Sequence, residues 1–188
     1  MRKLIFAINT TLDGNCDHSK VSGDDELHDY FACLLREADV LVYGRKTYEL
    51  MVPFWPDMAK TQTGPTKAIN EFARAFDSVG KIVVFSRSLA EAEGKTRIVR
   101  TKPRDEIRKL KQEQGKSILI GGVDLASQLI ELGLVDEYHF VVQPTLAGPG
   151  RRLLEGVSLP ESLQLKLVES KVFGSGCVAL RYCPREQI

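Results

Sequence analysis

Two adjacent glycines at the end of a short apolar segment offer the most specific chemistry in the chain. The segment 118–120 (Ile-Leu-Ile) is typical of a buried strand, and a helical pattern starts directly after Gly121 and Gly122. Glycine has no Cβ, so a ligand can approach its backbone closely, and the unpaired N–H groups at a helix start favour an anion. We expect a phosphate or pyrophosphate here, with a tight structural turn as the alternative. The expected contacts are Gly121, Gly122, Val123, Asp124 and Leu125.

A second apolar segment, residues 40–43, ends in a similar way. Gly44 follows it, and Arg45, Lys46 and Thr47 occupy the first turn of the next expected helix. The helix dipole disfavours cations at this end, so their presence favours an anionic partner. Arginine holds a phosphate through two parallel donors, and threonine adds a hydroxyl. These four residues are therefore candidates for phosphate binding, and a solvated basic turn is the alternative.

A third strand end carries Ser86, Arg87 and Ser88, which place a hydroxyl, a guanidinium and a second hydroxyl in sequence. This triplet suits a phosphate monoester such as the 2′-phosphate of NADP, with an ordinary polar loop as the alternative. Ligands of open α/β sheets bind outside the carboxyl ends of the strands, so three such ends predict one extended ligand with several phosphates. NADPH fits that description, although neither the G-x-G-x-x-G nor the G-x-x-x-x-G-K-[ST] motif is present.

These strand ends meet only if their strands lie in one sheet and point the same way. Strand patterns occur at residues 3–10, 40–43, 81–86, 97–100, 117–120 and 137–143, and helical patterns at 24–38, 66–76, 104–114 and 125–132. Their alternation predicts a mostly parallel sheet covered by helices on both faces. Residues 163–173 and 177–182 instead predict a C-terminal antiparallel hairpin. Residues 52–65, which include Trp55, predict a loop.

Size and composition narrow the class of protein. A chain of 188 residues is long enough for one domain, 1–188, with a substantial core. Its 26 basic and 25 acidic residues give a net charge of +1, so neither nucleic acid nor an anionic membrane is an expected partner. The first apolar segment holds five residues before Asn9 and predicts a strand, not a signal peptide. The four cysteines show no metal-binding or C-x-x-C spacing, which predicts free thiols in a reducing cytoplasm.

Five motifs, in order along the chain, resemble the dihydrofolate reductase-like family, and most closely the stand-alone bacterial form of the riboflavin-biosynthesis reductase domain. They are Asn9-Thr10-Thr11-Leu12-Asp13-Gly14, Gly44-Arg45-Lys46-Thr47-Tyr48-Glu49, Ser86-Arg87, Gly121-Gly122, and Leu134-Val135-Asp136-Glu137 leading into residues 144–150. The resemblance implies an α/β, three-layer dihydrofolate reductase-like fold, with a mostly parallel central sheet and the C-terminal hairpin. It also implies a homodimer.

The same resemblance implies an NADPH-dependent reductase that transfers hydride to a small heterocyclic or ribosylamino-pyrimidine-like acceptor. The H-x-E … P-C-x-x-C signature of a zinc deaminase is absent, so the bifunctional riboflavin enzyme is not expected. Two alternatives stay open. One is an NADP-binding redox sensor or subunit without turnover, and the other is a nitro- or quinone reductase of broad specificity built on the same site.

Two residues are candidates for the catalytic proton donor. His28 borders the apolar face of helix 24–38, and a histidine, whose ordinary pKa is about 6.5, donates readily near neutral pH. Asp13, at the end of the first strand, is the second candidate. Their alternatives are a surface histidine and a turn aspartate. The acceptor is expected to contact Asn9, Thr11, Phe31, Pro144, Gly148 and Gly150, with loop 144–150 closing the far side. His139, in mid-strand, is expected to be structural or to lie at a subunit contact.

The C-terminal hairpin also bears on assembly. Val178, Leu180 and Tyr182 would give the sheet an apolar edge with few charges, and an exposed apolar edge needs covering. A two-fold contact through this edge predicts a homodimer.

Overall fold

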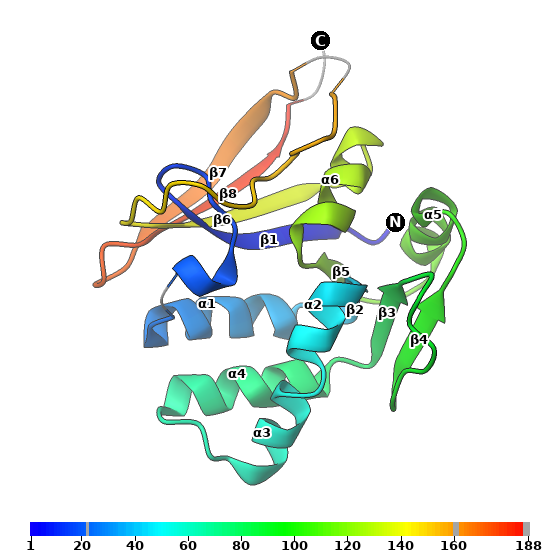
Figure 1. The fold of residues 1–188 in the computed structure, drawn as a ribbon, viewed down its shortest axis with the longest axis horizontal. Coiled ribbons are helices and arrows are strands. Elements are labelled where there is room, and N and C mark those ends of the chain that lie inside the picture. Colours follow the sequence, from blue (N-terminus) through cyan, green and yellow to red (C-terminus); the bar gives the residue numbers. More distant parts are fainter. Residues whose placement is uncertain (22, 160–161, 186–188) are drawn as a thin grey trace.

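An eight-stranded sheet forms the centre of the molecule (Figure 1), in a computed structural model that describes residues 1–21, 23–159 and 162–185. The strand order is β4-β3-β2-β5-β1-β6-β8-β7, and all neighbours are parallel up to β6. The strands are β1 Leu4–Thr11, β2 Ala38–Gly44, β3 Lys81–Phe85, β4 Thr96–Val99, β5 Ser117–Ile120, β6 Glu137–Gln143, β7 Leu165–Val172 and β8 Val178–Pro184. The mostly parallel sheet predicted from the alternating pattern is confirmed.

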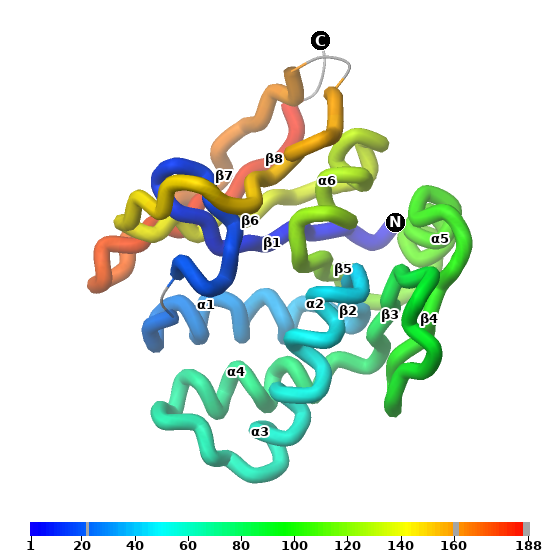
Figure 2. Tube along the Cα trace, in the orientation of Figure 1, coloured from blue at the N-terminus to red at the C-terminus, as the bar shows by residue number. Residues whose placement is uncertain are grey.

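Helices cover both faces of this sheet, as Figure 2 shows along the chain trace. They are η1 His18–Lys20, α1 Asp25–Arg36, α2 Arg45–Met51, α3 Trp55–Thr61, α4 Lys67–Ser78, α5 Pro103–Gln112 and α6 Val123–Glu131. Successive side chains of a strand point to opposite faces. Leu4 and Phe6 of β1 accordingly pack with α5 and α6, while Ile5 and Ala7 pack with α1 and α4. The result is the three-layer arrangement that the resemblance implies.

Residues 52–65 correct one prediction, because they contain the helix α3 and are not simply a loop. Pro56 occupies its first turn, where a missing N–H costs nothing, and Gln62 ends it in the left-handed region at φ 54°. The segment thus carries ordinary helix start and stop signals. Helix α3 packs against α4, and α4 packs against α1, on one side of the sheet.

The C-terminal hairpin is present, but its edge is not the one predicted from Val178, Leu180 and Tyr182. Strand β8 carries those residues and lies between β6 and β7, so it is paired on both sides. The edge strand is β7, where Leu167, Val168 and Val172 are exposed. Lysine and glutamate side chains alternate with them, and the β7–β8 register shifts after Leu167. A charged and irregular edge is less prone to indiscriminate pairing.

Two further features of the described residues bear on function. None of their helices combines the length and apolar character needed to cross a bilayer. They also contain no cluster of three or more His, Cys, Asp or Glu side chains that could hold a metal ion.

Candidate active site

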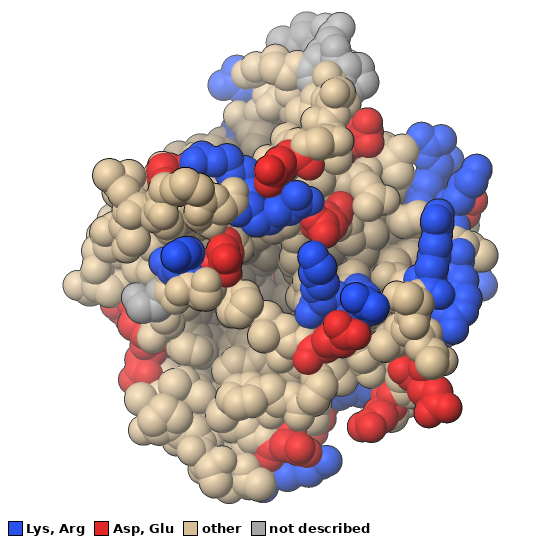
Figure 3. All heavy atoms as spheres, in the orientation of Figure 1, with Lys and Arg blue, Asp and Glu red and all other residues tan. Residues whose placement is uncertain are grey.

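The three strand ends singled out by their sequence lie next to one another. Strands β3, β2 and β5 are consecutive in the sheet, and the N–H of Gly121 donates to the carbonyl of Val42 at 3.3 Å. Their carboxyl ends open into a cleft of about 1170 Å³, visible as the hollow near the middle of Figure 3. This volume exceeds the roughly 300–1,000 Å³ of an ordinary small-molecule pocket, so the cleft has room for two ligands.

Most of the predicted site residues line this cleft. Those that do are Asn9, His28, Phe31, Gly44, Arg45, Lys46, Thr47, Ser86, Arg87, Gly121, Gly122, Val123, Asp124 and Leu125. Those that do not are Thr11, Asp13, Pro144, Gly148 and Gly150. The structure therefore brings the predicted cofactor residues together, while most of the predicted acceptor residues lie elsewhere.

One end of the cleft, here called the basic end, is formed by Gly44, Arg45, Lys46, Thr47, Ser86, Arg87, Arg100, Lys102, Gly121 and Gly122. Arg45 lies 3.0 Å from the Ser88 hydroxyl and 3.6 Å from a Glu49 carboxylate oxygen. Lys46 and Arg87 are exposed and have no hydrogen-bond or ion-pair partner among the described residues. Cations without a protein partner in a cleft favour an anionic ligand.

The glycines of the basic end differ in what they do. Gly44 has φ −80°, open to any residue, and a Cβ added there would meet no atom within 4 Å. Gly122 has φ 86°, and a Cβ there would collide with the hydroxyl of Thr47. Gly122 is therefore required by the fold itself, whatever binds beside it. Gly44 is the position where a side chain would project into free space in the cleft.

Arg100, Lys102 and Arg151 belong to the cleft although the sequence analysis did not select them. Arg100 and Lys102 follow the end of β4, so the strand-end rule applied to a fourth strand would have found them. The guanidinium of Arg100 donates to the carbonyls of Ser86 and Leu89, at 3.2 and 2.9 Å, and so fixes the loop that presents Arg87. Arg151 is ion-paired with Asp124, in the first turn of α6.

The opposite end, here called the aromatic end, is formed by Leu27, His28, Phe31, Leu50, Trp55 and Phe72, which come from α1, α2, α3 and α4. Trp55 and Phe72 are in edge contact with ring centroids 4.5 Å apart, and the His28 ring lies 5.7 Å from Phe72 and 6.3 Å from Trp55. Edge-on contacts at these spacings are favourable for aromatic rings. Trp55 was missed because residues 52–65 were interpreted as a loop. Phe72 was missed because it lies in the predicted helix 66–76, and no sequence pattern reveals that this helix packs against α3.

His28 is held in one orientation. Its Nδ1 lies 2.7 Å from the backbone carbonyl of Asp24. A carbonyl only accepts, so Nδ1 carries a proton and Nε2 is left for another partner. Gly23 packs so closely over the ring that a Cβ there would come within 2.7 Å of it. The imidazole is thus fixed at the cleft wall with one nitrogen uncommitted.

Asn9, on β1, is another polar residue that lines the cleft. Its Oδ1 atom is buried and has no hydrogen-bond partner in the described part of the chain. A buried amide oxygen without a partner costs free energy, so such groups usually have a ligand or a water. Asn9 is therefore a candidate contact for a bound ring with an N–H or O–H donor.

The structure argues against Asp13, the second predicted proton donor. Its carboxylate accepts from the N–H groups of Ala147 and Gly148, at 3.1 and 2.7 Å, and from the Thr11 hydroxyl. The Thr11 hydroxyl, followed by these N–H groups, lowers the pKa of Asp13 to about 2. Asp13 is therefore ionised at neutral pH and has no proton to give. Its role is to hold loop 144–150 in place through these hydrogen bonds.

Hydrogen bonds between loop 144–150 and the turn after β1 also explain why the other predicted acceptor residues lie outside the cleft. The Asn15 amide is fully buried and donates to the carbonyl of Pro149 at 3.2 Å. Gly150 packs on Asn15 so tightly that any Cβ would collide with that amide. Loop 144–150 is therefore bonded to the turn after β1, and it is Cys16, Asp17 and His18 of that turn that line the cleft.

His139 is structural, as one of its two predicted roles proposed. It is buried in a hydrogen-bonded chain in which Nδ1 lies 2.6 Å from the Tyr30 hydroxyl and Nε2 lies 2.9 Å from Glu137. Burial lowers the pKa of His139 and raises that of Tyr30 to about 12. Burial also opposes the charge of Glu137, but hydrogen bonds from Arg181, His139 and Lys3 outweigh it and lower its pKa to about 2.

A family model described as the RibD C-terminal domain matches residues 2–179. The chain belongs to the RibD C-terminal domain family. Among curated proteins it is similar to the uncharacterized protein YyaP of Bacillus subtilis (strain 168), with 31% identity over 185 residues, 96% of this chain and 94% of YyaP. It is also similar to the uncharacterized protein YwjB of the same organism, with 26% identity over 206 residues, 96% of this chain and 97% of YwjB.

Solved structures give the same RibD-like fold. A putative riboflavin biosynthesis protein from Shewanella sp. PV-4 has a TM-score of 0.72 and 24% identity, covering 99% of this chain and 100% of that chain. A pyrimidine reductase-like protein from Corynebacterium diphtheriae has a TM-score of 0.67 and 18% identity, covering 99% of this chain and 93% of that chain. The diaminohydroxyphosphoribosylaminopyrimidine deaminase/5-amino-6-(5-phosphoribosylamino)uracil reductase from Thermotoga maritima has a TM-score of 0.68 and 17% identity, covering 98% of this chain and 57% of that chain. The family and the fold implied by the sequence motifs are confirmed.

Proposed function

We propose that the protein is an NADPH-dependent reductase of the pyrimidine-reductase type, which transfers hydride to a small heterocyclic acceptor. The family supports a reductase. The observation that carries the proposal is the joining, in one cleft, of a basic end suited to phosphates and an aromatic end suited to a ring. Proteins that pass hydride between two ligands must hold both at once. The four cysteines are free thiols, in keeping with the reducing cytoplasm that we propose as its location.

The basic end fits NADPH in three ways. Gly44 leaves open space for close approach of a phosphate, and the uncommitted cations Lys46 and Arg87 supply opposite charge. The Ser86 hydroxyl oxygen accepts from the N–H of Leu89 at 2.9 Å, which leaves its O–H free to donate. When bound, NADPH supplies the hydride. We propose that Arg87 and Ser86 hold the 2′-phosphate, and that Gly44–Thr47 and Gly121–Leu125 hold the pyrophosphate.

Reduction of a heterocycle by hydride also requires a proton. His28 is our proposed donor, because its ring is fixed at the aromatic end with Nε2 uncommitted. Asp17, which also lines the cleft, has a pKa lowered by the N–H and hydroxyl of Ser19 and is therefore ionised near neutral pH. Phe31 and Asn9 would position the acceptor beside His28.

NADPH oxidation, followed at 340 nm over a panel of acceptors, tests this function. The panel should hold dihydrofolate, a ribosylamino-pyrimidine and its phosphate, simple pteridines, nitroaromatics and quinones. Turnover of any heterocycle that depends on His28 would support the proposal. Tight NADPH binding without turnover of any acceptor would instead favour an NADP-binding redox sensor or subunit.

Replacing Gly44 by Ala tests the basic end without disturbing the fold. The new Cβ enters open space, so the melting temperature should change little, while a phosphate lying against Gly44 would be displaced. The loss of one such contact should raise the NADPH dissociation constant by about tenfold. Gly80→Ala is the matched control, since its Cβ would make only an ordinary contact 3.7 Å from the Asp39 carbonyl. Isothermal titration of both variants measures the effect, and unchanged NADPH affinity in Gly44→Ala would contradict this placement.

We further propose a homodimer whose contact includes the edge strand β7. Val168 and Val172, 50% and 71% exposed, lie beside unpaired backbone groups of this strand. Pairing of two copies along β7 would cover the two valines and give these backbone groups hydrogen-bond partners. Sedimentation equilibrium at micromolar concentration should give twice the monomer mass of 21.0 kDa, and Val172→Lys should shift the protein toward the monomer. Leu146→Lys, at an exposed leucine in another loop, should not. A wild-type monomer would refute this assembly.

A further inference from the structure

The charge in the cleft is distributed unevenly. Its lysines and arginines are Arg45, Lys46, Arg87, Arg100, Lys102 and Arg151, which come from the first turn of α2, the ends of β3 and β4, and the segment after loop 144–150. Helices α1, α3 and α4 contribute Leu27, His28, Phe31, Leu35, Trp55, Phe72 and Phe76 to the described lining, and none of these is a lysine or an arginine.

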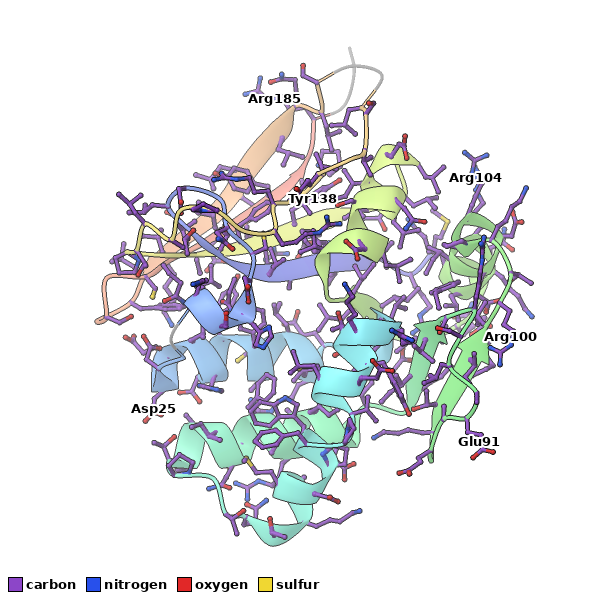
Figure 4. The ribbon with its side chains drawn as sticks, in the orientation of Figure 1. Asp25, Glu91, Arg100, Arg104, Tyr138 and Arg185 are labelled. Carbon is purple, nitrogen blue, oxygen red and sulfur yellow. The ribbon has the colours of Figure 1, made fainter. Side chains whose placement is uncertain are left out.

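The two ends meet along α2, which carries Arg45 and Lys46 in its first turn and Leu50 in its last. The start of α1 and the segment after β4 lie farther apart, as the labels of Asp25 and Arg100 on opposite sides of Figure 4 show. In Figure 3, blue side chains stand above and on both sides of the hollow, and the surface below it is mostly tan. A ligand held by α1, α3 and α4 therefore lies against side chains that carry no positive charge.

Outside the basic end, the polar side chains of the lining include Asn9, Asp17, His18 and His28. Asn9 has an unpartnered Oδ1 and His28 an uncommitted Nε2, while the negative carboxylate of Asp17 would repel a phosphate. Two such groups are enough to orient a ring through its N–H, O–H or carbonyl. They are poorly suited to a phosphate dianion, because a buried charge is costly without a counter-charge.

We propose that the aromatic end binds the acceptor as a flat, uncharged ring system that carries no phosphate, packed against Phe31 and Trp55 and oriented by Asn9 and His28. This inference rests on the proposed reductase function and specifies its substrate class. It separates this chain from the reductase named in the Thermotoga maritima structure, whose name specifies a phosphoribosyl group on its substrate.

Trp55 provides a direct test, because it is the single tryptophan of the chain and lies in the aromatic end. We would titrate the protein with 4-nitrobenzyl alcohol and with 4-nitrobenzyl phosphate, and follow Trp55 fluorescence excited at 295 nm. NADPH is left out, and excess inorganic phosphate occupies the cations of the basic end. The neutral alcohol should quench it saturably and bind at least about tenfold more tightly than the phosphate, because only the phosphate must lose its hydration without gaining a counter-charge. Fluorescence lifetimes separate binding from collisional quenching.

A charge introduced at the aromatic end gives the matched comparison. Leu50 is 46% exposed and lines this end, so Leu50→Arg should fold and should tighten binding of the phosphate by about tenfold. Leu146→Arg makes the same change at a leucine outside the cleft and should leave both affinities unchanged.

Three results would overturn the inference. The first is that the wild-type protein binds the phosphate as tightly as the alcohol, or more tightly. The second is that the alcohol causes no saturable quenching, and the third is that Leu146→Arg raises the affinity for the phosphate as much as Leu50→Arg does. Because NADPH is absent from these titrations, its failure to bind or to be oxidised would refute the proposed function separately and would leave this result unaffected.

Discussion

Replacing His28 by Gln should lower the rate of acceptor reduction by about 100-fold, the usual contribution of a positioned proton donor. The hydrogen bond from Nδ1 to the Asp24 carbonyl leaves Nε2 to carry the transferable proton. Glutamine has no acidic proton to transfer, so His28→Gln should bind NADPH normally and still reduce the acceptor slowly. Steady-state rates at saturating NADPH and acceptor measure the effect.

Two comparisons make the assignment of His28 specific. Asp13→Asn should lower the melting temperature, because it weakens the hydrogen bonds to the N–H groups of Ala147 and Gly148, but the rate of acceptor reduction should change little. His18 is the other imidazole that lines the cleft, on a side chain that is 72% exposed. If His18→Gln lowers the rate of acceptor reduction about 100-fold and His28→Gln does not, the proton donor is His18 and our assignment is wrong.

Replacing Arg87 by Ala should weaken NADPH binding by roughly 10- to 100-fold and leave NADH binding nearly unchanged. A charge-assisted contact between arginine and phosphate contributes about 1.5–3 kcal/mol, and only NADPH carries the 2′-phosphate. Arg87 has no other partner among the described residues, so its removal should not disturb the fold. Dissociation constants for both cofactors, measured by titration at one fixed ionic strength, provide the test.

Arg104→Ala is the control for this experiment. Arg104 is also exposed, on the nearby helix α5, and does not line the cleft (Figure 4). Its replacement removes one positive charge from the same region, so it measures the general electrostatic contribution. Equal losses of NADPH and NADH affinity in Arg87→Ala, or equal losses in the two variants, would show that Arg87 does not recognise the 2′-phosphate.

The sheet and the basic end could be predicted from the sequence because their signals are local. Each strand is a short apolar segment. Gly44 is the last residue of its strand, and Ser86 and Gly121 directly follow theirs. Parallel strands bring their carboxyl ends to one edge, so a correct fold class was sufficient to place these residues together. The β3–β2–β5 order then makes them neighbours.

The acceptor side could not be predicted in this way, because it depends on contacts between distant segments. Asp13 looks like a free acid in the sequence, and only the fold brings Ala147 and Gly148 close enough to occupy its oxygens. Trp55 and Phe72 meet because α3 packs against α4, which no periodicity reveals. The start signal of α3, with Pro56 in the first turn, was nevertheless present and could have been used.

The separation of the cleft into two ends also has a consequence for protein engineering. Strand ends build the basic end, whereas α1, α3 and α4 build most of the aromatic end, and α2 joins them through its first and last turns. Helix α4 packs on α1 and α3 packs on α4, and the two helices form a continuous stretch of chain, residues 55–78. The positions of this stretch that line the cleft can be varied to seek new acceptors, while the residues proposed to bind NADPH stay unchanged.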